Sequence, residues 1–411
     1  MKKRNTKHEK RLKRLVITCL LCAIILSVST YAWFIGMKTV SVNAFEVNIK
    51  TTESLMLSLD GKNWAYDVTI NKDSISPADY TGNQNSWGGD AGLIPMSTIG
   101  KIDTTKNKMT LFEKGSLTAT DGGYRLLASE VTNTAEKEED GYVAFDLFIR
   151  NLSGDAYYGD LGENEEAVYL TPESKVTVAD AGKVNAGIEN SVRVAFAQIG
   201  RVQNYTNETG TEQEAKVVQD ITCATAGKVT GICANRDATI WEPNDTKHVQ
   251  NAINWYTQSC KKRKSDDGSY LGTACNEIKD GSAYVTNAVA KAITAGGTDV
   301  YDGSVYNGYD GNVGASKNLF AVDTFTDSEK DLKGTARPTF MTLAPNSITK
   351  VRVYVYIEGQ DVDNYDFASL GQAIKVNFGF TKERYYGEDV DYDGNPELPE
   401  GLQSRTPEAN S

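Results

Sequence analysis

Apolar and polar residues alternate with a period of two near both ends of this chain, which is the strongest constraint on its fold. Residues two positions apart point to the same face of a strand, so these runs predict strands with one buried face. Gly, Asn, Asp or Pro residues bound the runs and favour turns there. The alternating runs lie at 40–49, 55–59, 142–149, 167–170, 192–196, 351–357 and 374–380.

Residues 202–335 differ from both ends, because they are rich in Gly, Asn, Thr, Asp and Ser. Apolar residues recur at helical spacing in 247–258 and again in 283–293, which predicts two short helices. Four cysteines also fall in this range. We interpret it as an insertion between two groups of strands.

Neither group of strands is accompanied by helices that could cover a parallel sheet. The sequence therefore predicts a mainly β fold, an antiparallel jelly-roll-like β-sandwich with a disulfide-bearing loop and helix insertion, preceded by an N-terminal signal or transmembrane helix. The expected organisation is a leader and signal peptide or membrane anchor at 1–36, the first part of the sandwich at 37–201, the insertion at 202–335, the closing strands at 336–385 and an acidic tail at 386–411.

The amino end has the pattern of an export signal. Eight basic residues lie in the first fourteen, and no charged residue occurs from Leu15 to Met37. Small residues at Thr30 and Ala32 occupy the positions that a signal peptidase reads, which predicts cleavage between Ala32 and Trp33. The 23 uncharged residues are also just long enough to span a bilayer, so a retained anchor remains the alternative. Either way the chain after residue 37 is expected outside the membrane, at the cell surface or beyond it, after export by the Sec route.

The four cysteines after the leader favour disulfides, because their number is even and the chain is expected to be exported. Local pairing would join Cys223 to Cys233 and Cys260 to Cys275, closing short loops in a polar region with little core of its own. Free buried thiols are the alternative.

The leader also resembles a known family. The run Ser-Thr-Tyr-Ala-Trp-Phe at 29–34, followed by a strand, resembles the signal region of TasA and camelysin-type exported proteins of Gram-positive bacteria, which a signal peptidase of the SipW kind processes. Further runs resemble a broad group of Gram-positive cell-surface proteins with the same leader, at 57–64, 143–149, 240–244 and 353–361.

The resemblance implies a jelly-roll domain outside the membrane. For the TasA branch it also implies assembly into biofilm-matrix fibres, in which a segment near the mature amino end completes the sandwich of the next subunit. In this chain that segment would be Trp33–Ile49. The alternative is that the strand from Val40 onward belongs to the chain's own sheet.

Residues 389–400 match the twelve-residue calcium loop, with carboxylates at positions one, three and five, Gly at six and Glu at twelve. A structural Ca²⁺ there would stabilise the end of the last strand, and no other cofactor is expected. Flanking helices are not predicted, so a solvated acidic tail is the alternative. The candidate ligands are Asp389, Asp391, Asp393, Asn395 and Glu400.

Composition argues against several functions. The net charge is −12 overall and −19 without the first 32 residues, whereas nucleic-acid binding needs a cationic face. The two histidines, His8 and His248, are too few for a metal hydrolase that uses several histidine ligands. No serine or cysteine nucleophile motif accompanies His248, and no Gly-rich phosphate loop is present. We therefore expect no catalytic site.

The function that these observations indicate is that of an exported structural or interaction protein, as a matrix or fibre subunit that assembles with itself. The alternative is a membrane-anchored surface module that binds a glycan or a protein, and an extracellular hydrolase ranks last. The expected partners are therefore the membrane, through the N-terminal helix, and either further copies of the chain or a surface ligand.

The calcium loop generates a test by thermal unfolding. Ca²⁺ should raise the melting temperature of the natural chain, because a ligand that binds the folded state stabilises it. The double substitution Asp391→Asn with Glu400→Gln should abolish this rise. A natural chain whose melting temperature does not respond to Ca²⁺ would show that the loop is a solvated tail.

Overall fold

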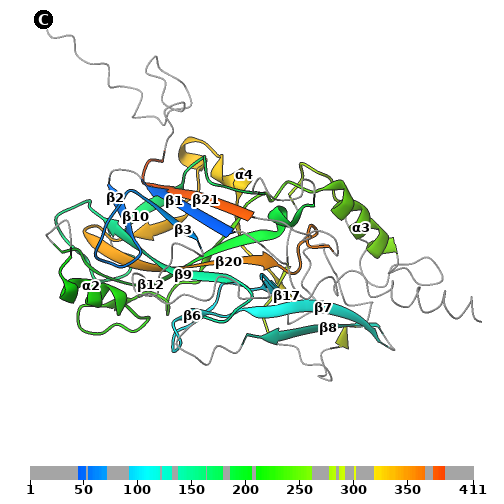
Figure 1. Ribbon diagram of the computed structural model, residues 1–411, viewed down its shortest axis with the longest axis horizontal. Coiled ribbons are helices and arrows are strands. Elements are labelled where there is room, and N and C mark those ends of the chain that lie inside the picture. Colours follow the sequence, from blue (N-terminus) through cyan, green and yellow to red (C-terminus); the bar gives the residue numbers. More distant parts are fainter. Residues whose placement is uncertain are drawn as a thin grey trace, which may run out of the picture.

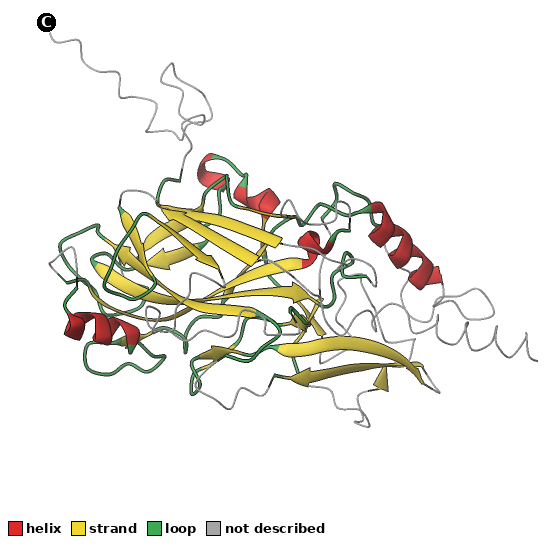
Figure 2. Cartoon of the chain, in the orientation of Figure 1, coloured by secondary structure: helices red, strands yellow, loops and turns green. Residues whose placement is uncertain are grey.

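The structure is a computed structural model, and it describes residues 45–51, 54–71, 92–120, 123–131, 138–162, 164–178, 186–205, 210–261, 277–283, 287–291, 300–301, 319–365 and 374–384. In these residues the chain is mainly β, as the alternation predicts. Two sheets pack against each other and short helices lie at the periphery (Figure 1; Figure 2).

The smaller sheet contains six strands and includes the first and last strands of the described chain. Strand β1 lies in its interior, between β21 and β3. The strand order is β19 (Met341–Leu343), β10 (Glu166–Leu170), β21 (Ile374–Thr381), β1 (Phe45–Thr51) and β3 (Asp67–Asn71), and β11 (Lys175–Val178) also pairs with β21.

The larger sheet contains eleven strands and is built around two long neighbours, β20 and β12. Its main order is β16 (Val300–Tyr301), β8 (Gly123–Glu130), β7 (Phe112–Thr120), β4 (Pro95–Ser97), β20 (Ser347–Glu358), β12 (Val192–Gln203), β14 (Thr239–Glu242) and β18 (Phe325–Thr326). In addition β13 (Thr230–Gly231) pairs with β12, and β9 (Val143–Asn151) pairs with both β20 and β2 (Leu55–Ser58).

Smaller elements complete the described fold. Thr211 and Thr326 begin α2 and α4 with capping boxes, which satisfy amides that a helix leaves unpaired at its start. The remaining elements are the pairs β5 (Ile102–Asp103) with β6 (Lys108–Met109) and β15 (Asn287–Val289) with β17 (Leu319–Ala321), the helices α2 (Glu212–Gln219), α3 (Gln250–Lys261) and α4 (Asp327–Lys330), and the 3₁₀ turns η1 (Ile188–Ser191) and η2 (Gly334–Ala336).

Three features differ from the sequence predictions. The sheets are mixed, because β1 pairs in parallel with β21, β4 with β20, and β14 with β18. Parallel pairing is possible here because long stretches of chain connect the partners. The helix expected at 283–293 is wrong over its described part, since 287–289 form β15 and pair with β17, whereas α3 confirms the helix expected at 247–258.

The third difference concerns the outer face of the larger sheet. Alternation at 351–357 predicts a strand with one buried face, so Tyr354 and Tyr356 would lie on an open face. Both are at most 1% exposed. A second apolar cluster covers this face, and it includes Met109 from β6 and Val218 from α2. The central strands β9, β12 and β20 are therefore buried on both faces, with the main core between the two sheets on the other face.

The Asp60-Gly61 turn forms as predicted. Asp60 Oδ1 accepts hydrogen bonds from the amides of Lys62 and Asn63 at 2.8 Å each. Gly61 has φ of +70°, and a Cβ there would lie 2.7 Å from Val218 Cγ1. The turn therefore needs glycine both for its backbone conformation and for its close approach to α2.

Burial of both faces of β20 generates a stability prediction. Arg352 is fully buried and its Nε donates to Asp146 Oδ1 on β9 at 2.7 Å. Asp146→Ala leaves that guanidinium without its main partner, and we expect a loss of about 3–5 kcal/mol in unfolding free energy, measured in urea. The exposed pair of Lys101 and Asp237 is the control, and Asp237→Ala should cost about 1 kcal/mol or less. Equal losses in both variants would contradict this account.

Candidate functional site

Most residues singled out by the sequence lie outside the described part of the chain. These are the cleavage pair Ala32 and Trp33, the calcium ligands Asp389, Asp391, Asp393, Asn395 and Glu400, and Cys275. Cys260 lies within α3, but its side chain is also outside the described part. The predictions about these residues remain predictions.

The other two cysteines lie at disulfide distance. Cys223 and Cys233 have sulfurs 2.05 Å and Cα atoms 5.2 Å apart, in the local pairing expected for them. Both belong to the cluster that covers the outer face of the larger sheet. The bond therefore closes a loop within the segment that follows α2, and β13 in that loop pairs with β12.

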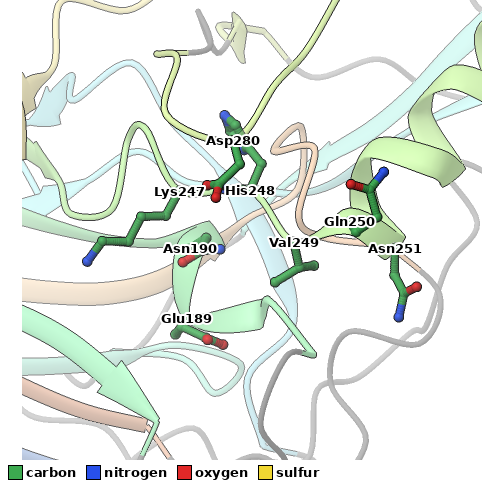
Figure 3. A pocket seen from close by; sticks show the side chains of 8 residues that line it. All are labelled: Glu189, Asn190, Lys247, His248, Val249, Gln250, Asn251 and Asp280. Atoms are coloured by element: carbon green, nitrogen blue, oxygen red, sulfur yellow. The ribbon is translucent and has the colours of Figure 1, made fainter.

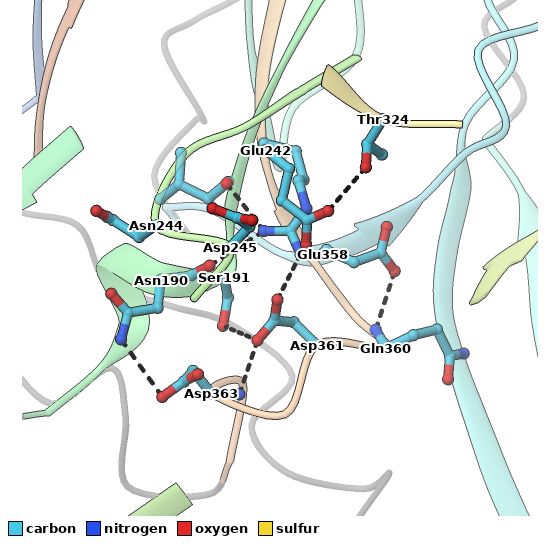
Figure 4. A network of polar contacts seen from close by, with 12 residues as sticks. Asn190, Ser191, Glu242, Asn244, Asp245, Thr324, Glu358, Gln360, Asp361 and Asp363 are labelled. Atoms are coloured by element: carbon cyan, nitrogen blue, oxygen red, sulfur yellow. Dashed lines mark hydrogen bonds and ion pairs between the residues drawn. The ribbon is translucent and has the colours of Figure 1, made fainter. Parts of the chain in front are cut away.

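A group of buried polar side chains lies where β12 begins and where β14 and β20 end (Figure 4). Arg193 of β12 contacts two carboxylates, Glu242 of β14 and Asp361 beyond β20. Asp361 also accepts from the Asp363 amide at 2.8 Å, and Glu242 accepts from the Thr324 hydroxyl at 2.9 Å. All three members of the Arg193 group are at most 7% exposed, so the group holds strands together away from water.

A further carboxyl, Glu358, lies at the end of β20 beside this group. Burial raises the pKa of Glu358 to about 8, against the opposing effects of the hydrogen bond from the Gln360 amide and of the Arg193 charge. Burial also raises the pKa of Glu242, although Arg193 opposes this. Glu358 is therefore mostly protonated at neutral pH.

His248 is buried and fixed by hydrogen bonds on both ring nitrogens. Its Nδ1 lies 2.7 Å from Asp363 Oδ2 and its Nε2 lies 3.1 Å from the Ser282 carbonyl oxygen. Both partner oxygens are acceptors, so the doubly protonated ring satisfies both contacts. Burial by itself would lower the pKa of His248, but the hydrogen bond and charge of Asp363 outweigh it and raise that pKa.

The two contacts give His248 a structural role. Neither nitrogen is left to take a proton from a substrate, which a general base must do. Asp363 also accepts from the Val249 amide at 3.0 Å, and so fixes the chain just before α3. The pair thus joins α3 to the segment that follows β20.

A polar pocket of about 620 Å³ opens beside this pair (Figure 3). Its lining comes from η1, the segment before α3, the first turn of α3 and the segment 277–283. The side chains around it are mostly acids and amides, with one exposed lysine. The lining residues are Glu189, Asn190, Lys247, His248, Val249, Gln250, Asn251 and Asp280.

A second cavity, of about 690 Å³, lies along the free side of β14, and we call it the β14 groove. Strand β18 pairs with β14 only at Trp241 and Glu242, and within the described residues no strand pairs with Thr239 or Ile240 on that side. The groove has a mixed lining, in which the apolar side chains include Phe320 and Leu332, each 43% exposed. It combines an incomplete sheet edge with exposed apolar side chains, two features of docking sites for extended chains.

Sequence reasoning missed most of these residues as a group. The resemblance at 353–361 includes Glu358 and Asp361 but not Asp363, and in the sequence His248 is a histidine without a nucleophile motif. His248 and Asp363 are 115 residues apart in the chain, and spacing in the sequence does not reveal a contact over such a separation.

Within the described ranges, no group of His, Cys, Asp and Glu residues is arranged to hold a metal ion. The same part of the chain contains no helix with both the length and the apolar character needed to cross a membrane. No protein-family model, curated protein or solved structure matches this chain. Proposals about its function therefore depend on its sequence and geometry.

Glu358 generates a pH prediction. Its pKa in the folded state is about 8 against a usual 4.5, so the folded chain keeps a proton that the unfolded chain loses, and stability should fall as pH rises from about 5 to 8. The pair of His248 and Asp363 contributes in the same direction, because the pKa of each is raised in the folded chain. The hydrogen bond and charge of Asp363 raise the pKa of His248, and burial raises the pKa of Asp363 to about 6. Glu358→Gln should remove up to about 1.4 kcal/mol per pH unit of this slope, measured by urea unfolding at several pH values.

The control is Glu173→Gln, which changes an exposed carboxyl in the turn between β10 and β11 and should leave the slope unchanged. A Glu358→Gln chain with the natural pH dependence would show that Glu358 is ionised in the folded protein.

Proposed function

We propose that this chain is an exported, non-catalytic structural protein of the bacterial cell surface, which assembles with copies of itself by strand complementation. In this proposal the described sheets belong to a jelly-roll-like sandwich, and the assembly is a fibre or biofilm matrix. The observation that carries the proposal is the β14 groove, a cavity with exposed apolar side chains beside an incomplete sheet edge.

The leader supports the location. Its basic start and uncharged stretch favour export, and its end resembles the signal region of TasA and camelysin-type proteins. A disulfide between Cys223 and Cys233 is in keeping with an oxidising compartment. The N-terminal helix would hold the chain at the membrane until cleavage, or permanently if cleavage does not occur.

The structure narrows the donor segment. Residues 45–51 form β1 and pair with β21 and β3 of the same chain, so both edges of this strand are already hydrogen-bonded within the chain. The proposed donor is therefore 33–44, which begins with Trp33, Phe34 and Ile35. After cleavage these three side chains would form an apolar amino end, and their burial in a partner would remove them from water.

The β14 groove suits such a donor in two ways. Thr239 and Ile240 leave room for a further strand at this edge, and the apolar side chains of the lining offer contacts for alternate side chains of that strand. Acidic residues at the groove, Asp323 and Glu329, complement the positive charge of Lys38 in the donor.

One alternative has a specific observation in its favour. The polar pocket beside His248 has a volume typical of small-ligand sites and many hydrogen-bonding side chains. It would suit an anchored surface module that binds a glycan or a protein segment. An extracellular hydrolase remains the least favoured, since His248 has both ring nitrogens in hydrogen bonds. The proposed calcium site at 389–400 would be structural in either case.

Electron microscopy of two purified chains tests the proposal. The chain that begins at Trp33 should form filaments, and the chain that begins at Phe45 should remain monomeric, because the two differ in the donor segment. Monomers in both preparations would contradict assembly by this segment and favour the binding module.

Substitutions in the groove separate its role from that of the donor. In the chain that begins at Trp33, Phe320→Asp should abolish filaments, because a charge beside the apolar side chains of the groove is costly to bury against the donor. Leu152→Asp is the control, since Leu152 is 41% exposed and is not among the groove residues. Filaments that survive Phe320→Asp would place the acceptor elsewhere.

A further inference from the structure

A polar hollow of about 430 Å³ lies on the outer face of the smaller sheet, and we call it the β21 hollow. It extends over β11, β21 and β1, and Figure 1 shows β21 and β1 side by side. Core residues such as Val47 and Val376 point to the other face of these strands, so the side chains at alternate positions face the hollow. Asn48 and Asn377 lie on its floor and are joined by a hydrogen bond of 2.9 Å.

One wall of the hollow depends on Gly379, because only a residue without a side chain lets the turn at 171–174 approach β21 this closely. The turn at 171–174 packs directly over this glycine. Thr171 donates its amide to the Gly379 carbonyl at 2.9 Å, and the Gly379 amide donates to Ser174 Oγ at 3.0 Å. A Cβ on Gly379 would lie 2.6 Å from Thr171 Oγ1. The floor and one wall of the hollow are therefore fixed by the backbone.

Two lysines lie on opposite sides of the hollow. Lys175 of β11 is paired in register with Asn377 of β21, and Lys50 of β1 is paired with Gly379, two residues further along. Neighbouring strands are about 4.8 Å apart and residues rise about 3.3 Å, which places the two lysine Cα atoms roughly 12 Å apart. Extended side chains can therefore bring both ammonium groups to one ligand between them.

These lysines differ from most others in the described part of the chain. Nine lysines there form ion pairs, including Lys375, which contacts Glu46 at 2.7 Å on the same face. Lys50 and Lys175 are exposed and have no carboxylate within 4.0 Å among the described residues. Both lysines therefore share one hollow without an ion pair among the described residues, although Glu173 also lines the hollow and the exposed Asp67 lies opposite Lys50 in register.

We propose that the β21 hollow binds a phosphate ester, with Lys50 and Lys175 holding the phosphate oxygens and Asn377 donating its side-chain amide. Lysine binds phosphate as a point charge, and two ammonium groups match a group that carries more than one negative charge. Asn377 Oδ1 already accepts from Asn48, so its Nδ2 is the atom that can donate to the ligand. The volume leaves room for an organic group beside the phosphate.

The site depends on correct pairing of β1. Lys50 lies on β1 and Lys175 on β11, so the two meet one ligand only while both strands pair with β21. Binding should therefore stabilise the folded chain and raise its melting temperature. This inference is independent of the β14 groove and of filament assembly, since it involves the other sheet.

Thermal unfolding and calorimetric titration of the full chain with glycerol 3-phosphate test the inference. At matched ionic strength, glycerol 3-phosphate should raise the melting temperature more than chloride does. General screening of charges is then equal in the two solutions, so the difference reports binding of the phosphate. Lys50→Ala and Lys175→Ala should each weaken binding about tenfold, the loss of one hydrogen bond to a charged group. Glu173→Gln should instead tighten binding, because this exposed carboxylate lines the same hollow and repels the phosphate.

Lys228→Ala is the matched control, as it removes an exposed lysine that does not line the hollow and should leave binding unchanged. Long-chain polyphosphate, in a separate titration, identifies the source: tighter binding per site than glycerol 3-phosphate indicates a polymer, and equal binding indicates a small molecule. A melting temperature that responds to glycerol 3-phosphate no more than to chloride overturns the inference. So does binding that both lysine variants retain at natural strength.

Discussion

Burial of β20 on both faces is the constraint on which the rest of the described structure depends. All twelve of its residues are buried, with Val351, Val353 and Val355 in the core between the sheets. The opposite face carries Arg352 and is covered by the second apolar cluster. Charges on that face cannot reach water, so each one needs a partner or has to be neutralised. Arg352 has the carboxylate of Asp146 beside it.

The same constraint separates polar groups that are buried and hold strands together from surfaces that a partner or ligand can reach. The group of Arg193, Glu242 and Asp361 is buried where strands end, and its members satisfy one another. Two of the features that a partner or ligand can reach lie elsewhere: the β14 groove at an edge of the larger sheet, and the β21 hollow on the outer face of the smaller one. The proposed assembly uses the groove, and the proposed phosphate site uses the hollow.

Local patterns predicted α3 and seven of the strands, because alternation and helical spacing are properties of neighbouring residues; these strands are β1, β2, β9, β10, β12, β20 and β21. They could not show that β1 pairs in parallel with β21, since that contact joins the two ends of the described chain. Nor could they show that Tyr354 is buried, because the covering cluster comes from distant segments. The same holds for the pair of His248 and Asp363. The Asp60-Gly61 turn was predictable because its hydrogen bonds are local.

Hydrogen exchange of the assembled chain that begins at Trp33 tests the central claim most directly. If a donor strand from another copy fills the β14 groove, amides of Thr239 or Ile240 should exchange more slowly in filaments than in the chain that begins at Phe45, because they gain partners. The amides of β1 should exchange alike in both, since β1 stays in its own sheet. Unchanged exchange at β14 in filaments, or altered exchange at β1, would contradict the account.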